Sequence, residues 1–283
     1  MRNRPLLAFA VLIGFGCFAS SAYADVWDKE WSVPSNAQVH VNANFGNLRI
    51  DAGDFTQIKA LVRTKGWRIA GDEVKVTANQ AENKIELEVK LLHSRTYWQI
   101  DHEITIELTV PRSATLDLHT DHGNITTHGV EGSLRSDTGD GNIEAVGGKG
   151  TIRLHTGDGN INANTLDGSL SADTGDGNVN LEGRFDGLDV RTGDGNLNGT
   201  AIAGSRLLSP WKFQTGDGNV LLRLQDNVGA DLDATTGGGR VTVDFPVTTS
   251  GTIHSKTVRG PMNGGGQQLY IHTGDGNITI VKH

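Results

Sequence analysis

The sequence predicts an all-β fold: a single-stranded β-solenoid (β-helix) whose coils contain about 18 residues and turn at glycine-rich corners. Three observations carry this prediction. The pentapeptide TGDGN occurs six times, its copies stand at a regular interval, and the residues on either side of it alternate between apolar and polar. A fixed period of about 20 residues is typical of solenoids, and alternation with a period of two is typical of β-strands.

The interval is set by the threonine that opens each corner. Successive corners are 18 residues apart over most of the repeat region, and the last step, of 37 residues, is close to two periods. At about 3.3 Å per residue, 18 residues make a loop about 60 Å around, which suits one narrow coil. Two of the corners are degenerate, TDHGN and TGGGR. The threonines are Thr120, Thr138, Thr156, Thr174, Thr192, Thr215, Thr236 and Thr273.

Every second residue before and after a corner is predicted to face the core. A second turn half a period later, at Gly148–Gly150, Asp167–Gly168 and Asp186–Gly187, would complete each coil. A sandwich of β-hairpins is the alternative fold, but it does not require identical corners at a fixed interval. The inward residues are Leu134/Ser136, Ile152/Leu154, Leu170/Ala172, Leu188/Val190 and Trp211/Phe213 before the corners, and Ile143, Ile161, Val179, Leu197, Val220 and Ile278 after them.

The region before the regular repeats, residues 25–119, is predicted to continue the solenoid with longer loops and to cap it. The segment NFGNLRID at Asn44–Asp51 resembles an early corner and strand, and no helix longer than two turns is expected. Two insertions, around Trp67–Gly71 and His93–Trp98, carry aromatic residues that would cover the open end or, alternatively, form a glycan or peptide platform. Strands are expected at Val39–Ala43, Ile58–Arg63, Val74–Ala78, Lys84–Leu91 and Ile104–Val110, and residues 120–283 form the regular repeats.

Residues 1–24 are predicted to be a signal peptide. A short basic start is followed by the apolar run Leu6–Phe18 and by the small-residue sequence AYA at Ala22–Ala24, a pattern typical of export and cleavage. The mature chain would begin at Asp25. An N-terminal membrane anchor is the alternative, but the apolar run is shorter than the roughly 20 residues that a membrane span needs. The only cysteine, Cys17, lies in this segment, so disulfides are not expected in the mature protein.

Composition narrows the class of partner. The net charge of −8 argues against a nucleic-acid surface, which needs clustered positive charge. No later segment of the sequence is apolar for long enough to span a membrane. We therefore expect an exported protein that is periplasmic, extracellular or attached to the cell surface.

The stretch VPRSATLDLHTDHGNITTHGVEGSLRSDTGDGNI, from Val110 to Ile143, resembles the bacterial putative-adhesin family of β-strand-repeat domains of unknown function. A VP step, alternating strands and repeated T-G-D/S-G-N/D-I corners form that family's pattern. The resemblance implies a β-strand-repeat fold over most of the mature chain and an adhesin-like role. It supplies no catalytic residues.

The GDGN corner is interpreted as a structural turn. Glycine would supply two positive φ angles, the aspartate would form an Asx-turn, and the asparagines would stack as an amide ladder. The alternative, a cation or phosphate cradle, lacks the spacing of dinucleotide, P-loop, EF-hand and RTX calcium motifs. The structural corner residues are Gly139, Gly141, Asn142, Gly157, Gly159, Asn160, Gly175, Gly177, Asn178, Gly193, Gly195 and Asn196.

The remaining candidates for chemistry are acidic and histidine side chains. Stacked carboxylates about 5 Å apart repel by only about 1 kcal/mol per pair in water, so the aspartate column does not demand a metal, and no metal or cofactor is expected. A second outward column alternates His119, Asp137, His155, Asp173 and Arg191. The weak metal candidates are Asp140, Asp158, Asp176, Asp194, His119 and His122.

These observations predict an exported, non-catalytic β-solenoid that acts as an adhesin-like or cell-envelope interaction module. Its partner would be a glycan or protein of the envelope or surface. The alternative is a polysaccharide-active β-helix lyase or hydrolase. Such an enzyme would need a concave cleft that holds three or more convergent charged side chains.

Overall fold

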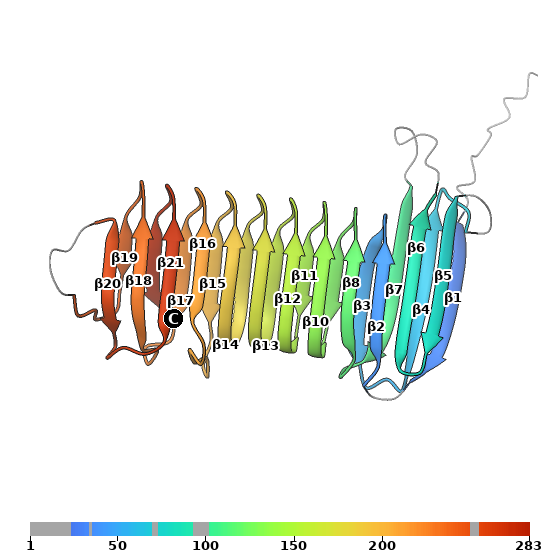
Figure 1. Cartoon of the computed structure of the whole chain (residues 1–283), viewed down its shortest axis with the longest axis horizontal. Helices are drawn as coiled ribbons and strands as arrows, with labels where there is room; N and C mark the ends of the chain where they lie inside the picture. Colours follow the sequence, from blue (N-terminus) through green and yellow to red (C-terminus); the bar gives the residue numbers. More distant parts are fainter. Residues whose placement is uncertain (1–23, 34–35, 70–72, 93–101, 250–254) are drawn as a thin grey trace, which may run out of the picture.

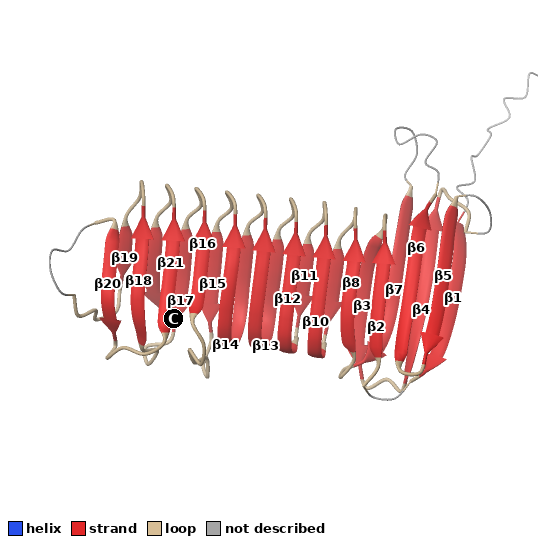
Figure 2. Cartoon of the chain, viewed as in Figure 1, coloured by secondary structure: helices blue, strands red, loops and turns tan. Residues whose placement is uncertain are grey.

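The structure is a computed structural model and describes residues 24–33, 36–69, 73–92, 102–249 and 255–283. These residues form 22 strands and no helix (Figure 2), so the expected all-β fold is confirmed for them. All 22 strands are hydrogen-bonded into one continuous sheet. This sheet winds into an elongated stack of coils (Figure 1).

The first face of the stack consists of the strands that lead into the corners. Neighbouring strands on this face are parallel and in register, so that Ile152 pairs with Leu134 on one side and with Leu170 on the other. In spatial order the face contains β6 (Lys84–Leu91), β2 (Gln38–Ala43), β8 (Thr115–Thr120), β10 (Glu131–Thr138), β12 (Lys149–Thr156), the second halves of β13 (Ile161–Thr174) and β14 (Val179–Thr192), β16 (Trp211–Thr215), β21 (Gln268–Thr273) and β18 (Ala230–Thr236).

The second face consists of the strands that leave the corners. Here too the pairing is parallel, and Ile143 lies between Ile125 and Ile161. In spatial order the face contains β7 (Glu103–Pro111), β3 (Asn47–Gly53), β9 (Ile125–His128), β11 (Ile143–Val146), the first halves of β13 and β14, β15 (Leu197–Ala201), β17 (Val220–Leu224), β22 (Ile278–Lys282) and β19 (Val241–Val243).

Near both ends of the stack, the order of coils in space differs from their order in the chain. The coil formed by β2 and β3 lies between β6–β7 and β8–β9. The coil formed by β21 and β22 lies between β16–β17 and β18–β19. The 37-residue step from Thr236 to Thr273 is therefore not two successive coils, because Thr273 in β21 lies one coil nearer the middle of the stack than Thr236 in β18.

Antiparallel strands close the two ends of the stack. At one end β4 (Gln57–Lys65) pairs with β7 and with β1 (Ala24–Ser32), while β5 (Val74–Ala81) pairs with β6. At the other end β20 (Thr257–Met262) pairs with β18. Covering the last parallel strands in this way limits the edge that could pair with another chain.

The core lies between the two faces and follows the predicted alternation. Ile152, Leu154 and Ile161 are buried, whereas Arg153 between the first two is exposed. The largest fully buried side chain, Trp211, packs edge-on against Phe185 with the ring centroids 6.5 Å apart. The inward positions predicted before and after the corners are all buried, which confirms the period of two.

The second turn agrees with the prediction in one coil and differs from it in two. Gly148 lies in the short connection between β11 and β12, where the turn at Gly148–Gly150 is expected. Asp167 and Gly168 lie within β13, and Asp186 and Gly187 lie within β14, so both predicted turns are bends inside continuous strands of 14 residues. The register shifts between Gly168 and Ser169, and Gly168 has a φ of 134°. A bulge at a glycine lets the strand change direction while the pairing continues on both sides.

The described tryptophans of the first third, Trp27, Trp31 and Trp67, lie at the β1 end of the stack. Trp31 and Trp67 are buried, and Trp67 stacks on His102 and meets Phe45 edge-on. Their burial favours the capping role over an exposed platform. Tyr97 and Trp98 lie outside the described residues, as do residues 70–72 of the first insertion.

Candidate functional site

The corner threonine is the side chain that joins one coil to the next. Thr156 Oγ1 donates a hydrogen bond to the carbonyl oxygen of Gly141 in the preceding coil (2.7 Å) and accepts one from the Gly159 amide of its own corner (3.2 Å). The hydroxyl thus satisfies two buried backbone groups. The same bond to the neighbouring coil is made by Thr120, Thr138, Thr174, Thr192, Thr215, Thr236 and Thr273.

The corner glycines are required for space and not for a positive φ. None of Gly139, Gly141, Gly157 and Gly159 is among the residues with positive φ, so the predicted left-handed conformation is wrong for these corners. A Cβ atom at Gly159 would lie 1.8 Å from the carbonyl oxygen of Gly141. The backbones of adjacent corners approach so closely that no side chain fits between them. The same holds at Gly175, Gly177, Gly193 and Gly195.

The asparagines form a ladder along the corners. Asn160 donates both its backbone N–H and its Nδ2–H to the side-chain oxygen of Asn142, at 2.9 and 3.1 Å. Each asparagine therefore bonds the next coil through two hydrogen bonds, which fixes the corner register. The ladder runs through Asn47, Asn124, Asn142, Asn160, Asn178, Asn196, Asn219 and Asn277.

The aspartates of the corners point outward and take little part in the turn. Asp158, Asp176 and Asp194 are exposed, and no hydrogen bond of the described chain involves their carboxylates, so the predicted Asx-turn is absent there. The threonine hydroxyl bonds the corner amide instead. Asp140 differs because its carboxylate lies 2.7 Å from Nδ1 of His122. Within the described residues no group of three or more histidine, cysteine or acidic side chains could hold a metal ion.

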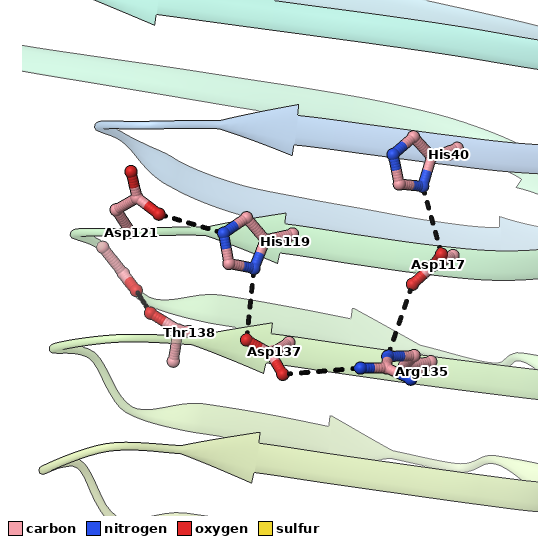
Figure 3. A network of polar contacts seen from close by, with 8 residues as sticks. His40, Asp117, His119, Asp121, Arg135, Asp137 and Thr138 are labelled. Atoms are coloured by element: carbon pink, nitrogen blue, oxygen red, sulfur yellow. Dashed lines mark hydrogen bonds and ion pairs between the residues drawn. The ribbon is translucent and has the colours of Figure 1, made fainter.

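A polar network crosses the first face at β2, β8 and β10 (Figure 3). His119 lies between two carboxylates, with Nε2 at 3.0 Å from Asp121 and Nδ1 at 3.1 Å from Asp137. Arg135 links Asp137 to Asp117. Its Nη2 lies 3.8 Å from Oδ2 of Asp137, and its Nε lies 3.7 Å from Oδ1 of Asp117.

The network extends along the stack through similar pairs. His40 bonds Asp117 at 3.1 Å, and farther along His155 lies 3.3 Å from Asp173. Each histidine thus pairs with an aspartate of a neighbouring coil. The structure brings His119 close to Asp137, as the outward column places them, but His122 contacts a different aspartate, Asp140.

One half-buried charge cluster was not predicted from the sequence. Arg184 in β14 donates hydrogen bonds to both oxygens of Asp186, at 2.7 and 2.8 Å, and another to Asp167 of the neighbouring coil. The hydrogen bond from Arg184 holds the pKa of Asp186 below its ordinary value, against a smaller opposing effect of burial. Both aspartates occupy the second turn of successive periods, which is the signal in the sequence that could have indicated this cluster.

The stacked parallel coils and their shared corners define a repeat protein of the β-solenoid-like class. Residues 182–281 match the family described as Toastrack DUF4097. The resemblance to the bacterial putative-adhesin β-strand-repeat family is thereby confirmed, and the matching domain has no known function.

Solved structures with a similar fold have very different sequences. A protein of Parabacteroides distasonis described as a putative lipid-binding protein is 11% identical, covers 92% of this chain and 98% of its own, and has a TM-score of 0.52. A putative adhesin of Bacteroides fragilis is 11% identical, covers 92% of this chain and 97% of its own, and has a TM-score of 0.45. A putative adhesin of Parabacteroides distasonis is 11% identical, covers 90% of this chain and 97% of its own, and has a TM-score of 0.46.

No curated protein matches the sequence. In the part of the chain that the structure describes, no helix has the length and hydrophobicity of a membrane span.

Proposed function

We propose that this chain is an exported, non-catalytic β-solenoid that acts as an adhesin-like interaction module of the cell envelope. The observation that carries the proposal is the register of the outward side chains. Asn162, Asn180 and Asn198 lie on adjacent strands, and each amide bonds the next at 2.9 Å. A rigid face that presents the same group at three successive coils suits a ligand that is itself repetitive, because several weak contacts then act together.

Export is supported by the sequence of residues 1–24, with its basic start, apolar run and AYA cleavage pattern. The mature protein would then be periplasmic or exposed on the cell surface. A binding role is also in keeping with the description of the Parabacteroides distasonis structure as a putative lipid-binding protein.

The GDGN corners serve the fold in this proposal and not a ligand. Threonine and asparagine make the bonds between coils, and glycine permits the close approach of the backbones. The domain arrangement follows from this division, with residues 25–119 forming the capping region and residues 120–283 forming the regular repeats. The exposed carboxylates of Asp158, Asp176 and Asp194 remain free for weak contact with solvent cations.

A polysaccharide-active enzyme would need a hollow with convergent charges, and the β1 end of the stack has a hollow of about 260 Å³. Three of the four carboxylates that line it are held in ion pairs: Glu30 with Lys59 at 2.6 Å, Glu107 with Arg63 at 2.7 Å, and Asp51 with His128 at 3.0 Å. Asp28 is the one lining carboxylate without an ion pair among the described residues. A glycoside hydrolase needs one of its two carboxyl groups protonated. This pairing therefore favours a non-catalytic role.

The test uses the chain from Asp25 onward. Its binding to a glycan array and to isolated envelope fractions is measured, together with the release of reducing ends from the bound polysaccharides. We expect retention on at least one envelope component without turnover. Absence of retention on every fraction would overturn the interaction module, and release of reducing ends would overturn the non-catalytic assignment. Mass spectrometry of the exported chain should show that it begins at Asp25.

A further inference from the structure

A hollow of about 180 Å³ lies on the first face, over β12, β13 and β14. It exists because small residues occupy its floor. In one outward column Thr151, Ser169 and Gly187 are paired in register, and in the next column Ser171 stands between Arg153 and Asp189. Since neighbouring strands are about 4.8 Å apart, the two charged residues stand on strands about 10 Å apart with only a serine between them.

One end of the hollow is closed by the segment that joins β15 to β16, which protrudes at the lower edge of the stack in Figure 1. Ser209 and Pro210 of this segment line the hollow. Ser209 comes so close to the sheet that a Cβ atom at Gly187 would lie 2.4 Å from its hydroxyl oxygen. The segment between β15 and β16 therefore packs directly against Gly187, and it makes this part of an otherwise flat face concave.

Two charged side chains at the hollow, Arg153 and Asp189, lack part of their possible ion-pair or hydrogen-bond partners among the described residues. Arg153 is exposed, and its guanidinium has no carboxylate partner among the described residues, whereas its neighbour Arg135 contacts Asp117 and Asp137. Asp189 accepts from Arg191 through Oδ2 (3.0 Å), but its Oδ1 is buried and has no hydrogen-bond partner. A buried acceptor without a donor costs free energy, so a small rotation of this carboxylate toward a bound donor would be favourable.

We propose that this hollow binds an acidic sugar unit, with the sugar carboxylate at Arg153 and sugar hydroxyl groups at Asp189. The guanidinium is suited to a carboxylate, which it can bond through two parallel N–H groups. Arg191 already neutralises Asp189, so Asp189 acts as an acceptor for hydroxyl groups and not as the counter-charge for an ammonium group. The hydroxyls of Thr151, Ser169, Ser171 and Ser209 can both donate and accept, as sugar hydroxyls require.

This inference rests on the proposed function, since it names the chemical class of ligand that the module would take. Its test is a calorimetric titration of the mature chain with a tetramer of galacturonic acid. The methyl ester of the same tetramer serves as the uncharged counterpart. We expect the acid to bind and the ester to bind at least tenfold more weakly. An arginine–carboxylate bond accounts for a difference of that size.

Two variants locate the site. Arg153→Gln removes the unpaired charge from an exposed position and should weaken binding of the acid about tenfold or more, while leaving the circular dichroism spectrum unchanged. Arg135→Gln is the matched control, because it lies in the same column one strand away and outside the hollow, and it should bind like the unaltered chain. Equal binding of acid and ester, or equal weakening by both variants, would overturn the proposal.

The envelope assay separates this proposal from the wider one. If Arg153→Gln loses acid-tetramer binding and its retention on envelope fractions falls, both proposals are supported. If the unaltered chain does not bind the acid tetramer but is retained on envelope fractions, the proposed sugar site is wrong and the proposal of an interaction module is still supported. If neither occurs, the interaction module itself fails.

Discussion

Thr156 and Gly141 belong to adjacent coils, and the buried hydroxyl of the first donates to the carbonyl of the second at 2.7 Å. The same hydroxyl accepts from the Gly159 amide. One side chain therefore secures both its own corner and the contact with the neighbouring coil. Because the arrangement recurs at successive corners, the threonine column stabilises the turn side of the whole stack.

Replacing Thr156 by valine, which has nearly the same shape, should destabilise the protein by about 1–3 kcal/mol, because two buried backbone groups lose their partner. Thr156→Ser keeps the hydroxyl and should lose much less. Denaturant unfolding followed by circular dichroism measures both. Equal destabilisation by valine and serine would show that the methyl group, and not the hydrogen bonds, matters at this position.

Replacing Gly159 by alanine or valine should destabilise the fold by about 3 kcal/mol, since the new Cβ would overlap the carbonyl oxygen of Gly141. Asp158→Asn is the matched control in the same corner. Its exposed carboxylate has no partner in the described chain, so its effect should stay within about 0.5 kcal/mol. Thermal melts compare the two, and the reverse order of stabilities would contradict the steric explanation.

Calcium should have little effect on stability. Each corner offers one carboxylate, whereas calcium takes six to eight oxygen ligands. The mature chain should therefore show a β-rich circular dichroism spectrum in excess chelator, and millimolar calcium should raise its melting temperature by no more than a few degrees. A coil-like spectrum that becomes β-rich on adding calcium would instead make Asp140, Asp158, Asp176 and Asp194 ligands.

The free energy of unfolding should fall in acid, partly because the stabilising contact between Arg184 and Asp186 is lost. The hydrogen bond lowers the folded-state pKa of Asp186 below its ordinary value of 3.8. A lowered carboxyl pKa stabilises the fold above the ordinary value, and this contribution is lost as the pH falls through the folded pKa. The melting temperature should therefore drop more between pH 6 and pH 3 in the unaltered chain than in Asp186→Asn.

The control for that comparison is Asp158→Asn, which removes an exposed and unpaired carboxylate. Its melting temperature should fall with pH as steeply as that of the unaltered chain. If Asp186→Asn also falls as steeply, the contact with Arg184 contributes nothing to acid stability.

Much of the fold can be predicted from the sequence because the same pattern of corner and alternating residues recurs along the chain. Alternation around the corners identifies the inward positions, such as Ile152 and Leu154, and the five strands expected before Val110 all occur. The reason for the corner glycines cannot be predicted, because it depends on how closely Gly159 approaches the backbone of another coil. Asp167–Gly168 looks like a separate turn in the sequence, but pairing with both neighbours keeps β13 continuous through it.

The hollow beside Arg153 could not be predicted for a similar reason. Its floor comes from two outward columns of the repeat, and its end comes from Ser209 in an insertion that breaks the period. Nothing in the sequence shows that Ser209 returns to lie against Gly187. The lack of a carboxylate partner for Arg153 among the described residues likewise becomes apparent only when neighbouring strands are placed side by side.

The position of β21 and β22 bears on how the chain reaches its final state. A chain that emerges from a translocation pore amino end first could add coil upon coil only as far as β17. The strands that follow, β18 and β19, find their permanent neighbours in a segment that has not yet emerged. β18 and β19 must therefore stay unpaired with the stack until β21 and β22 emerge, or they must first pair elsewhere and then separate so that β21 and β22 can enter. The final segment thus completes the stack from within, because β21 and β22 pair with strands on both sides.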